Sequence, residues 1–195
     1  MTHKNRYNPQ IHHRRSIRLA GYDYTQAGAY FITICTHNRQ NLFGEVVAGE
    51  MVLNENGRIV AACWLDLARH FPHITLGEWV VMPNHIHGII VIVVGRGEAS
   101  ASKTVDNPDG LRADASPLRP QPNGTDSGSI GAMVQNFKSV ASRKINKQRG
   151  TPGTPVWQRN YWEHIIRDEQ AYQRIAHYIA NNPAQWDADS LWSSP

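Results

Sequence analysis

The sequence predicts an α+β fold of the ferredoxin-like, split βαβ type, with a central antiparallel sheet and one extra helix at the C-terminus. Three observations predict it. Strand-like and helix-like segments follow one another in the order strand, helix, strand, strand, helix, strand, helix. The second and third strands are separated by so short a break, at Pro83 and Asn84, that they are expected to pair as an antiparallel hairpin. A last helical stripe follows the final strand and adds a helix to the ferredoxin-like core.

The first half of the domain is expected to hold a strand, a helix and a second strand. Aromatic and β-branched residues predict a central strand over 29–36. A weaker extended stretch, 43–53, is broken at Gly49. Apolar residues at helical spacing predict a helix over 58–71, with Asn54 or Asn56 as its N-cap. The next strand covers 74–82.

The second half holds the third strand, two helices and the last strand. The elements predicted here are a strand over 85–94, a helix from 130 to about 147 with Ser129 as N-cap, a turn and strand over 156–167, and a helix over 169–182 capped by Asp168 and closed by Pro183.

Composition divides the 195 residues into three parts. Residues 1–28 are polar and basic and are predicted to be an N-terminal arm. Residues 95–128 are dense in Ser, Pro, Gly, Asp and Asn, and we expect a disordered insertion loop because such a segment buries too little apolar surface to offset chain entropy. Residues 29–94 and 129–195 remain for a single folded domain.

Charge and cysteine content limit the classes of binding partner and the cellular location that we expect. Net charge is +4, residues 1–18 carry no acid, and 129–167 hold seven Lys or Arg against one Glu. A single run of one charge is more often a solvated face than a binding site, but two such segments in one small domain favour a nucleic-acid partner over chance. Cys35 and Cys63 lie in apolar patterns typical of reduced core cysteines. No apolar run approaches the roughly twenty residues that span a membrane, so we expect a cytoplasmic protein with no membrane partner. The candidate DNA contacts are Arg14, Arg15, Arg18, Lys138, Arg143, Lys147 and Arg159.

Two histidines open the predicted strand 85–94. His85 and His87 are two residues apart and share one face, at the start of the strand, where we expect them near the sheet's edge and open to ligand. Two imidazoles so placed can bind one ion if a third ligand arrives from elsewhere. With ten histidines in the chain, the pair alone does not distinguish a metal site from an incidental one.

The terminal helix carries a tyrosine and an amide on one side. Tyr178 points away from the apolar stripe, and Asn182 lies one turn further along. A phenol can attack a phosphodiester when a base or a metal assists it, and an amide oxygen can serve as a metal ligand. The alternative is a surface tyrosine at the edge of a helix.

Three ordered motifs resemble the REP-associated tyrosine transposases, relatives of the single-tyrosine HUH transposases of small bacterial insertion sequences. They are WVVMPNHIH at 79–87, WQRNYWEHIIR at 157–167 and YIANNP at 178–183, and residues 14–19 and 28–36 resemble the family's opening. The resemblance implies that 29–94 and 129–195 form an HUH catalytic domain acting on single-stranded or hairpin DNA.

The resemblance also implies the site. His85 and His87 become ligands of Mg²⁺ or Mn²⁺, Asn182 the third ligand, and Tyr178 the nucleophile that forms a 5′-phosphotyrosine. The implied activity is that of a transposase-like endonuclease and strand transferase. The alternatives are a hairpin-DNA binder without catalysis and a metal-dependent phosphohydrolase, and monomer and homodimer both stay open. Trp157, Tyr161 and Trp162 are candidates for stacking on bases, with a role in the core as the equal alternative for each. Strand alternation could aim Glu163 or His164 at the site, although a structural role is favoured for both.

Overall fold

The computed structural model describes residues 22–93, 125–189 and 191–192. Its centre is a four-stranded antiparallel sheet in the order β4-β5-β1-β6. The strands are β1 (Gly28–Cys35), β4 (Ile74–Met82), β5 (His85–Ile92) and β6 (Trp162–Ile166). Two split βαβ halves produce this order, so the predicted ferredoxin-like fold is confirmed.

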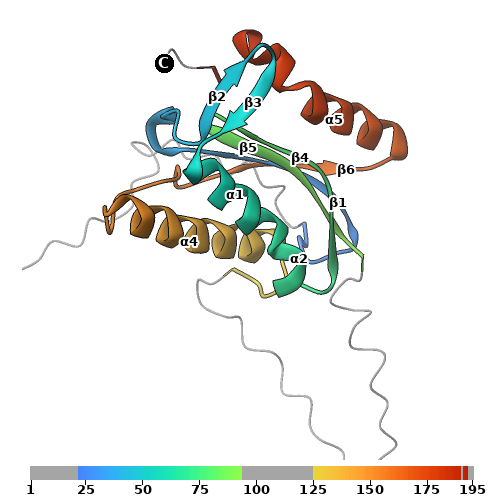
Figure 1. The fold of residues 1–195 in the computed structure, drawn as a ribbon. Helices are drawn as coiled ribbons and strands as arrows, with labels where there is room; N and C mark the ends of the chain where they lie inside the picture. The colour runs from blue at the N-terminus through green and yellow to red at the C-terminus, as the bar shows by residue number, and fades with distance from the viewer. Residues whose placement is uncertain (1–21, 94–124, 190, 193–195) are drawn as a thin grey trace, which may run out of the picture.

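The helices cover the two faces of the sheet (Figure 1). On one face lie α1 (Glu55–Leu65), α2 (Leu67–His70) and α4 (Ile130–Arg149); on the other lies α5 (Glu169–Asn181). Alternation along the strands assigns side chains to each face. Ile86 and Ile90 of β5 face the α1 and α4 side, while Ile89 packs with Ile179 of α5.

Side-chain caps set the starts of the helices. Asn54 accepts a hydrogen bond from Gly57 N at 3.0 Å, and Asp168 accepts one from Ala171 N at 2.7 Å. Ser129 caps α4 in the same way. These bonds satisfy amides of the first turn that have no partner within the helix, and they confirm the predicted caps, with Asn54 rather than Asn56 at α1.

The first helix differs from its prediction. A single helix over 58–71 was expected, but the structure has α1 starting at Glu55 and a break at Asp66 before the four-residue α2. The Asn54 cap adds a first turn with no apolar side chain before Gly57, which explains the earlier start. The apolar stripe runs on through buried Leu67, so the pattern does not reveal the break.

Between β1 and α1 the chain forms the short helix η1 (His37–Arg39) and a hairpin. Its strands are β2 (Gly44–Val47) and β3 (Glu50–Leu53), which pair in a separate two-stranded sheet. The turn residues Ala48 and Gly49 have φ values of 51° and 80°. Both values suit a tight hairpin turn, and Gly49 adopts its value without strain. The predicted break at Gly49 is therefore confirmed.

Gly88 allows α1 to approach β5 closely. A Cβ atom at Gly88 would lie 2.3 Å from Cζ2 of the buried Trp64. The glycine that follows His87 is thus required by packing on the opposite face of the sheet from the histidine.

The N-terminal arm folds onto the domain where it is described. Tyr22 and Tyr24 pack against Tyr30, and the Tyr22 and Tyr30 hydroxyls lie 3.2 Å apart. The rest of the predicted arm, 1–21, and residues 94–124, which hold most of the predicted insertion, lie outside the described residues. Among the helices that are described, none is long and apolar enough to cross a membrane.

Candidate metal centre and nucleophile

His85 and His87 project from the start of β5 toward the α5 side of the sheet. The prediction that they lie near the sheet's edge and open to ligand is wrong, because β5 is an inner strand and the two residues are only 0% and 3% exposed. They are covered by α5 and by the segment after it, where Trp186 lies against the His85 ring. Trp186 belongs to the short helix η2 (Pro183–Ala188).

Asn84 orients the His85 ring. Its amide nitrogen donates to the carbonyl of Leu191 at 2.8 Å and to that of Arg39 at 3.3 Å, which leaves its oxygen to face His85 Nδ1 at 2.8 Å. Since that oxygen only accepts, Nδ1 carries the proton and Nε2 carries the lone pair. His85 Nε2 is buried with no hydrogen-bond partner among the residues described. An unpartnered buried acceptor is costly, and a metal ion would satisfy it.

Thr33 and Tyr178 hold the His87 ring. The register of β1 against β5 places Thr33 opposite His87, and Thr33 Oγ1 lies 2.8 Å from Nδ1. Nε2 faces the Tyr178 hydroxyl at 3.2 Å. The two imidazoles therefore turn their Nε2 atoms to one side, as metal-binding histidines with partnered Nδ1 atoms do.

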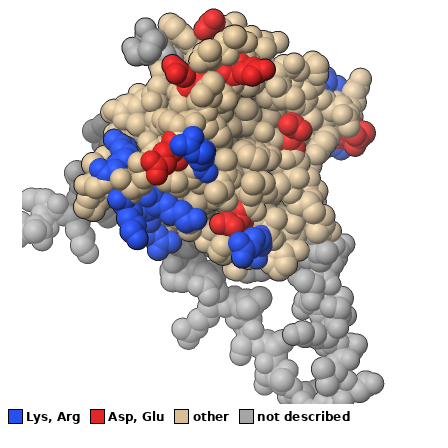
Figure 2. All heavy atoms as spheres, viewed as in Figure 1, with Lys and Arg blue, Asp and Glu red and all other residues tan. Residues whose placement is uncertain are grey.

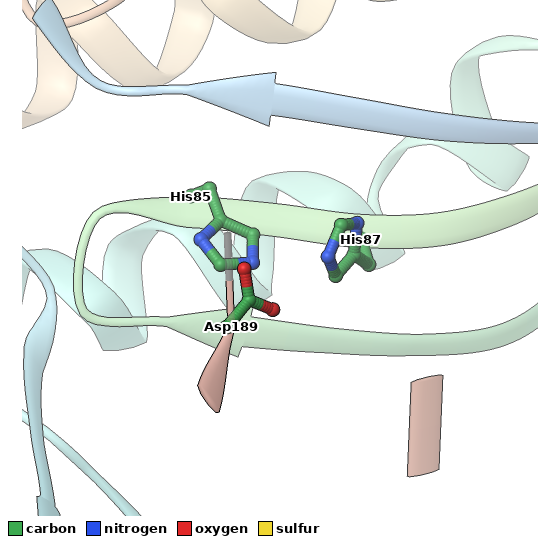
Figure 3. A group of neighbouring side chains, drawn as sticks. All are labelled: His85, His87 and Asp189. Atoms are coloured by element: carbon green, nitrogen blue, oxygen red, sulfur yellow. The ribbon is translucent and has the colours of Figure 1, made fainter. Parts of the chain in front are cut away.

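Asp189 brings a carboxylate to the histidines. It follows η2, and one ligand atom from each of His85, His87 and Asp189 lies within 4.8 Å of the others. Figure 3 shows the carboxylate beside the two imidazoles of β5. Sequence reasoning missed this residue.

Asn182, the predicted third ligand, contacts Asp189. It is 2% exposed, and its amide nitrogen donates to Asp189 Oδ2 at 2.9 Å. Its Oδ1 is buried without a hydrogen-bond partner in the part of the chain that is described. Two imidazole nitrogens with carboxylate and amide oxygens form a donor set that suits Mn²⁺ and can hold Mg²⁺. The residues present thus fit a divalent ion.

Burial keeps both imidazoles neutral. It lowers the pKa of His85 to about 3, with a further contribution from the positive charge of Arg39. Burial likewise lowers the pKa of His87 well below its usual value, and the neighbouring His85 adds to the effect. Neutral imidazole is the form that binds a metal.

Tyr178, the candidate nucleophile, is more exposed than the two histidines. It is 41% exposed, and its hydroxyl donates to Asp189 Oδ2 at 3.4 Å besides facing His87. Burial and the negative charge of Asp189 raise the pKa of the phenol. The phenol therefore stays protonated at neutral pH and has an acceptor within reach, while its edge is open to a large substrate.

The candidate DNA contacts fall in different places. Arg143 and Lys147 are exposed on α4, on the sheet face opposite Tyr178, and Figure 2 shows Lys and Arg side chains gathered over α4. Lys138 donates instead to the carbonyls of Gln158 and Asn160 at 2.9 and 2.8 Å, and its burial lowers its pKa to about 8. Three candidates, Arg14, Arg15 and Arg18, lie outside the described residues.

The side chains of the motif at 157–167, which includes β6, point to both faces of the four-stranded sheet. Trp157 is buried against Phe43 and Phe137 on the α4 side. Glu163 is buried too, and its neighbours in the strand, Trp162 and His164, point to the α5 side. Of the three aromatic candidates, Trp162 is therefore the exposed one, and it lies on the same side of the sheet as Tyr178.

Comparison with known proteins gives relatives in sequence and in fold. The chain is 43% identical over 187 residues to an uncharacterized Haemophilus influenzae protein, covering 96% of this chain and 97% of the relative. It is 23% identical over 164 residues to an H. influenzae protein predicted to be a REP-associated tyrosine transposase, covering 84% and 74% of the two chains. No family model matches the chain.

A solved structure of a REP-associated tyrosine transposase bound to a REP hairpin has a similar fold. The TM-score is 0.53 at 17% sequence identity, over 87% of this chain and 74% of that one. At this sequence identity the likeness concerns the fold alone.

Proposed function

We propose that the chain is a relative of the REP-associated tyrosine transposases, and that it cleaves and rejoins single-stranded or hairpin DNA through a 5′-phosphotyrosine intermediate. The observation that carries the proposal is the position of the Tyr178 hydroxyl. It lies 3.2 Å from His87 Nε2, next to the unpartnered Nε2 of His85. Tyr178 and the two histidines can thus reach the same phosphate group.

The residues that would hold Mg²⁺ or Mn²⁺ are His85, His87 and Asp189, with Asn182 Oδ1 as a further oxygen. The ion, when bound, withdraws charge from a non-bridging phosphate oxygen. Asn84 and Thr33 keep the two imidazoles turned toward it.

Tyr178 performs the covalent step. Its Oη attacks phosphorus and forms the Oη–P bond, while the bond from phosphorus to the 3′-oxygen breaks. The phenol proton passes to Asp189 Oδ2, which already accepts its hydrogen bond, and the departing 3′-oxygen takes up a proton to become a hydroxyl. A 3′-hydroxyl of another strand reverses the step and joins the two strands, so no nucleotide energy source is consumed.

The test is formation of a covalent adduct. Labelled single-stranded DNA with a hairpin is incubated with the protein and Mn²⁺ or Mg²⁺, and adducts are separated under denaturing conditions. We expect an adduct with the wild type and with Tyr172→Phe, and none with Tyr178→Phe. Tyr172 is the matched control because it lies on the same helix and packs at Gly77 of β4, away from the histidines.

The two alternatives give different results in the same assay. A DNA binder without catalysis retains affinity but yields no adduct with the unaltered protein. A phosphohydrolase that uses water retains turnover after Tyr178→Phe. Either result would overturn the proposal.

A further inference from the structure

A cleft of about 490 Å³ lies beside Tyr178. His87 and Tyr178 line it on the metal side, and Gln158, Asn160 and Trp162 line it on the side of β6. Its volume is within the range of about 300–1,000 Å³ that is usual for small-molecule sites. A cavity of this volume has room for one nucleobase.

Trp162 offers an aromatic surface at this cleft. It is 43% exposed although it lies in a strand, and large aromatic side chains are usually well buried. Phe31 contacts it edge-on with centroids 5.5 Å apart, and His164 stacks parallel to it at 5.9 Å and 5°. Phe31 also contacts the Tyr178 ring edge-on. The indole is thus held in place, and only one ring lies between it and the nucleophile.

Hydrogen bonds from Lys138 stabilise the polar residues that line the cleft. The ammonium group of Lys138 donates to the carbonyls of Gln158 and Asn160 at 2.9 and 2.8 Å and lies over the Tyr161 ring. This holds residues 158–161 in one conformation before any ligand binds. Carboxamide side chains such as those of Gln158 and Asn160 carry both a donor and an acceptor, as the edges of nucleobases do.

The charge of the lining also suits DNA. Among the described residues that line the cleft there is no carboxylate, and the ammonium group of Lys138 binds the backbone carbonyls of two of them, Gln158 and Asn160. Single-stranded nucleic acid is commonly bound by aromatic rings beside positive charge.

We propose that this cleft is a subsite for one unpaired nucleobase, the one that adjoins the scissile phosphate, and that the base stacks on Trp162. The inference rests on the proposed function, because the phosphate in question is the one that Tyr178 attacks. The base would anchor the strand so that the phosphate stays beside the phenol.

The experiment measures binding without covalent chemistry. Tyr178→Phe protein with Mn²⁺ selects its tightest hairpin oligonucleotide from a pool with randomised single-stranded flanks. Each flank position is then replaced in turn by an abasic site, and affinity is measured by fluorescence anisotropy. We expect one position at which loss of the base weakens binding about 5- to 150-fold, the range that base–aromatic stacking gives.

Variants of Trp162 locate that base. Trp162→Ala should weaken binding of the intact oligonucleotide to the same extent and should add nothing once the base is missing, while Trp162→Phe should retain most of the affinity. The control is Leu65→Ala, another exposed apolar side chain, on α1 across the sheet. Additive losses, or no sensitive position, would overturn the subsite. The two proposals can fail separately. If the wild type forms an adduct at Tyr178 but the losses from Trp162→Ala and from the abasic site add, the proposed function stands and the subsite fails. If the two losses do not add but no adduct forms, the subsite stands and the proposed function fails.

Discussion

Acid is expected to destabilise the folded protein through its two buried histidines. The pKa of His85 is about 3 in the folded state, against an ordinary value of 6.5 that an unfolded chain would regain. Between these values the unfolded chain binds a proton that the folded protein does not. His87 is shifted in the same direction by its burial. The free energy of unfolding therefore falls as the pH drops below about 6.5.

The size of the effect follows from the difference in bound protons. One proton of difference changes the free energy of unfolding by about 1.4 kcal/mol per pH unit. Between pH 7 and pH 5, allowing for partial protonation near 6.5, His85 alone contributes about 2 kcal/mol, and the lowered pKa of His87 adds to the loss in the same direction. This is a large share of the about 5–15 kcal/mol that stabilises an ordinary domain.

Urea unfolding at pH 7, 6 and 5 in the presence of EDTA measures this loss. We expect His85→Gln to lose about 2 kcal/mol less than the wild type over this interval. The control His70→Gln removes an exposed imidazole on α2 and should follow the wild type. A His85→Gln profile parallel to that of the wild type would refute the neutral, buried imidazole from which the metal site is argued.

Three further predictions concern the ligands, the DNA contacts and the packing. Asp189→Asn and Asn182→Ala should each weaken Mn²⁺ binding by at least about 10-fold in calorimetric titration, and unchanged affinity would remove that residue from the ligand set. Arg143→Gln and Lys147→Gln should each reduce the slope of log K against log salt concentration by about 1 if a phosphate contacts that residue; an unchanged slope places the DNA elsewhere. Gly88→Ala should lower the free energy of unfolding by about 1–3 kcal/mol because the added methyl group collides with α1, and a smaller loss in urea unfolding would contradict the tight packing.

Local patterns predict most of the fold because they act over a few residues. The Asp168 and Ser129 caps depend on a side chain that bonds an amide three residues on. The break between β4 and β5 follows from Pro83, which cannot donate to a ladder. The break at Asp66 is invisible to the same reasoning, because an apolar stripe continues through it and only backbone geometry changes.

Proximity across the chain is harder to predict from patterns. Tyr178 is 91 positions from His87, and the resemblance of ordered motifs, rather than spacing, suggested that the two lie together. The burial of His85 depends on which strands flank β5 and on how the chain returns over it after α5. No periodicity in residues 79–94 encodes either feature.

Asp189 is a residue of the candidate site that no sequence pattern identifies. It lies beyond the last helix, after Pro183 stops α5 and a 3-10 turn reverses the chain. Neither its spacing from the histidines nor its neighbours distinguish it from other acids of the chain. Two contacts make its position specific: the amide of Asn182 donates to Oδ2, and so does the Tyr178 hydroxyl. An aspartate held by the predicted third ligand and the predicted nucleophile can be recognised only once α5 is seen to cross the histidines.

The different exposure of the ligands and the nucleophile has a chemical reason. Metal ligands bind most strongly when they are held in place and shielded from water. The candidate ligands His85, His87 and Asn182 are at most 3% exposed, and Asp189 is half-buried. A nucleophile that attacks a DNA backbone must be reached by a polymer too large to enter a closed cavity. Tyr178 meets this need because it lies on the solvent side of the same site, and its ring contacts His87 with centroids 5.3 Å apart. A largely buried set of candidate ligands next to an exposed phenol therefore suits the proposed strand cleavage, whereas hydrolysis of a small phosphate ester needs no exposed phenol.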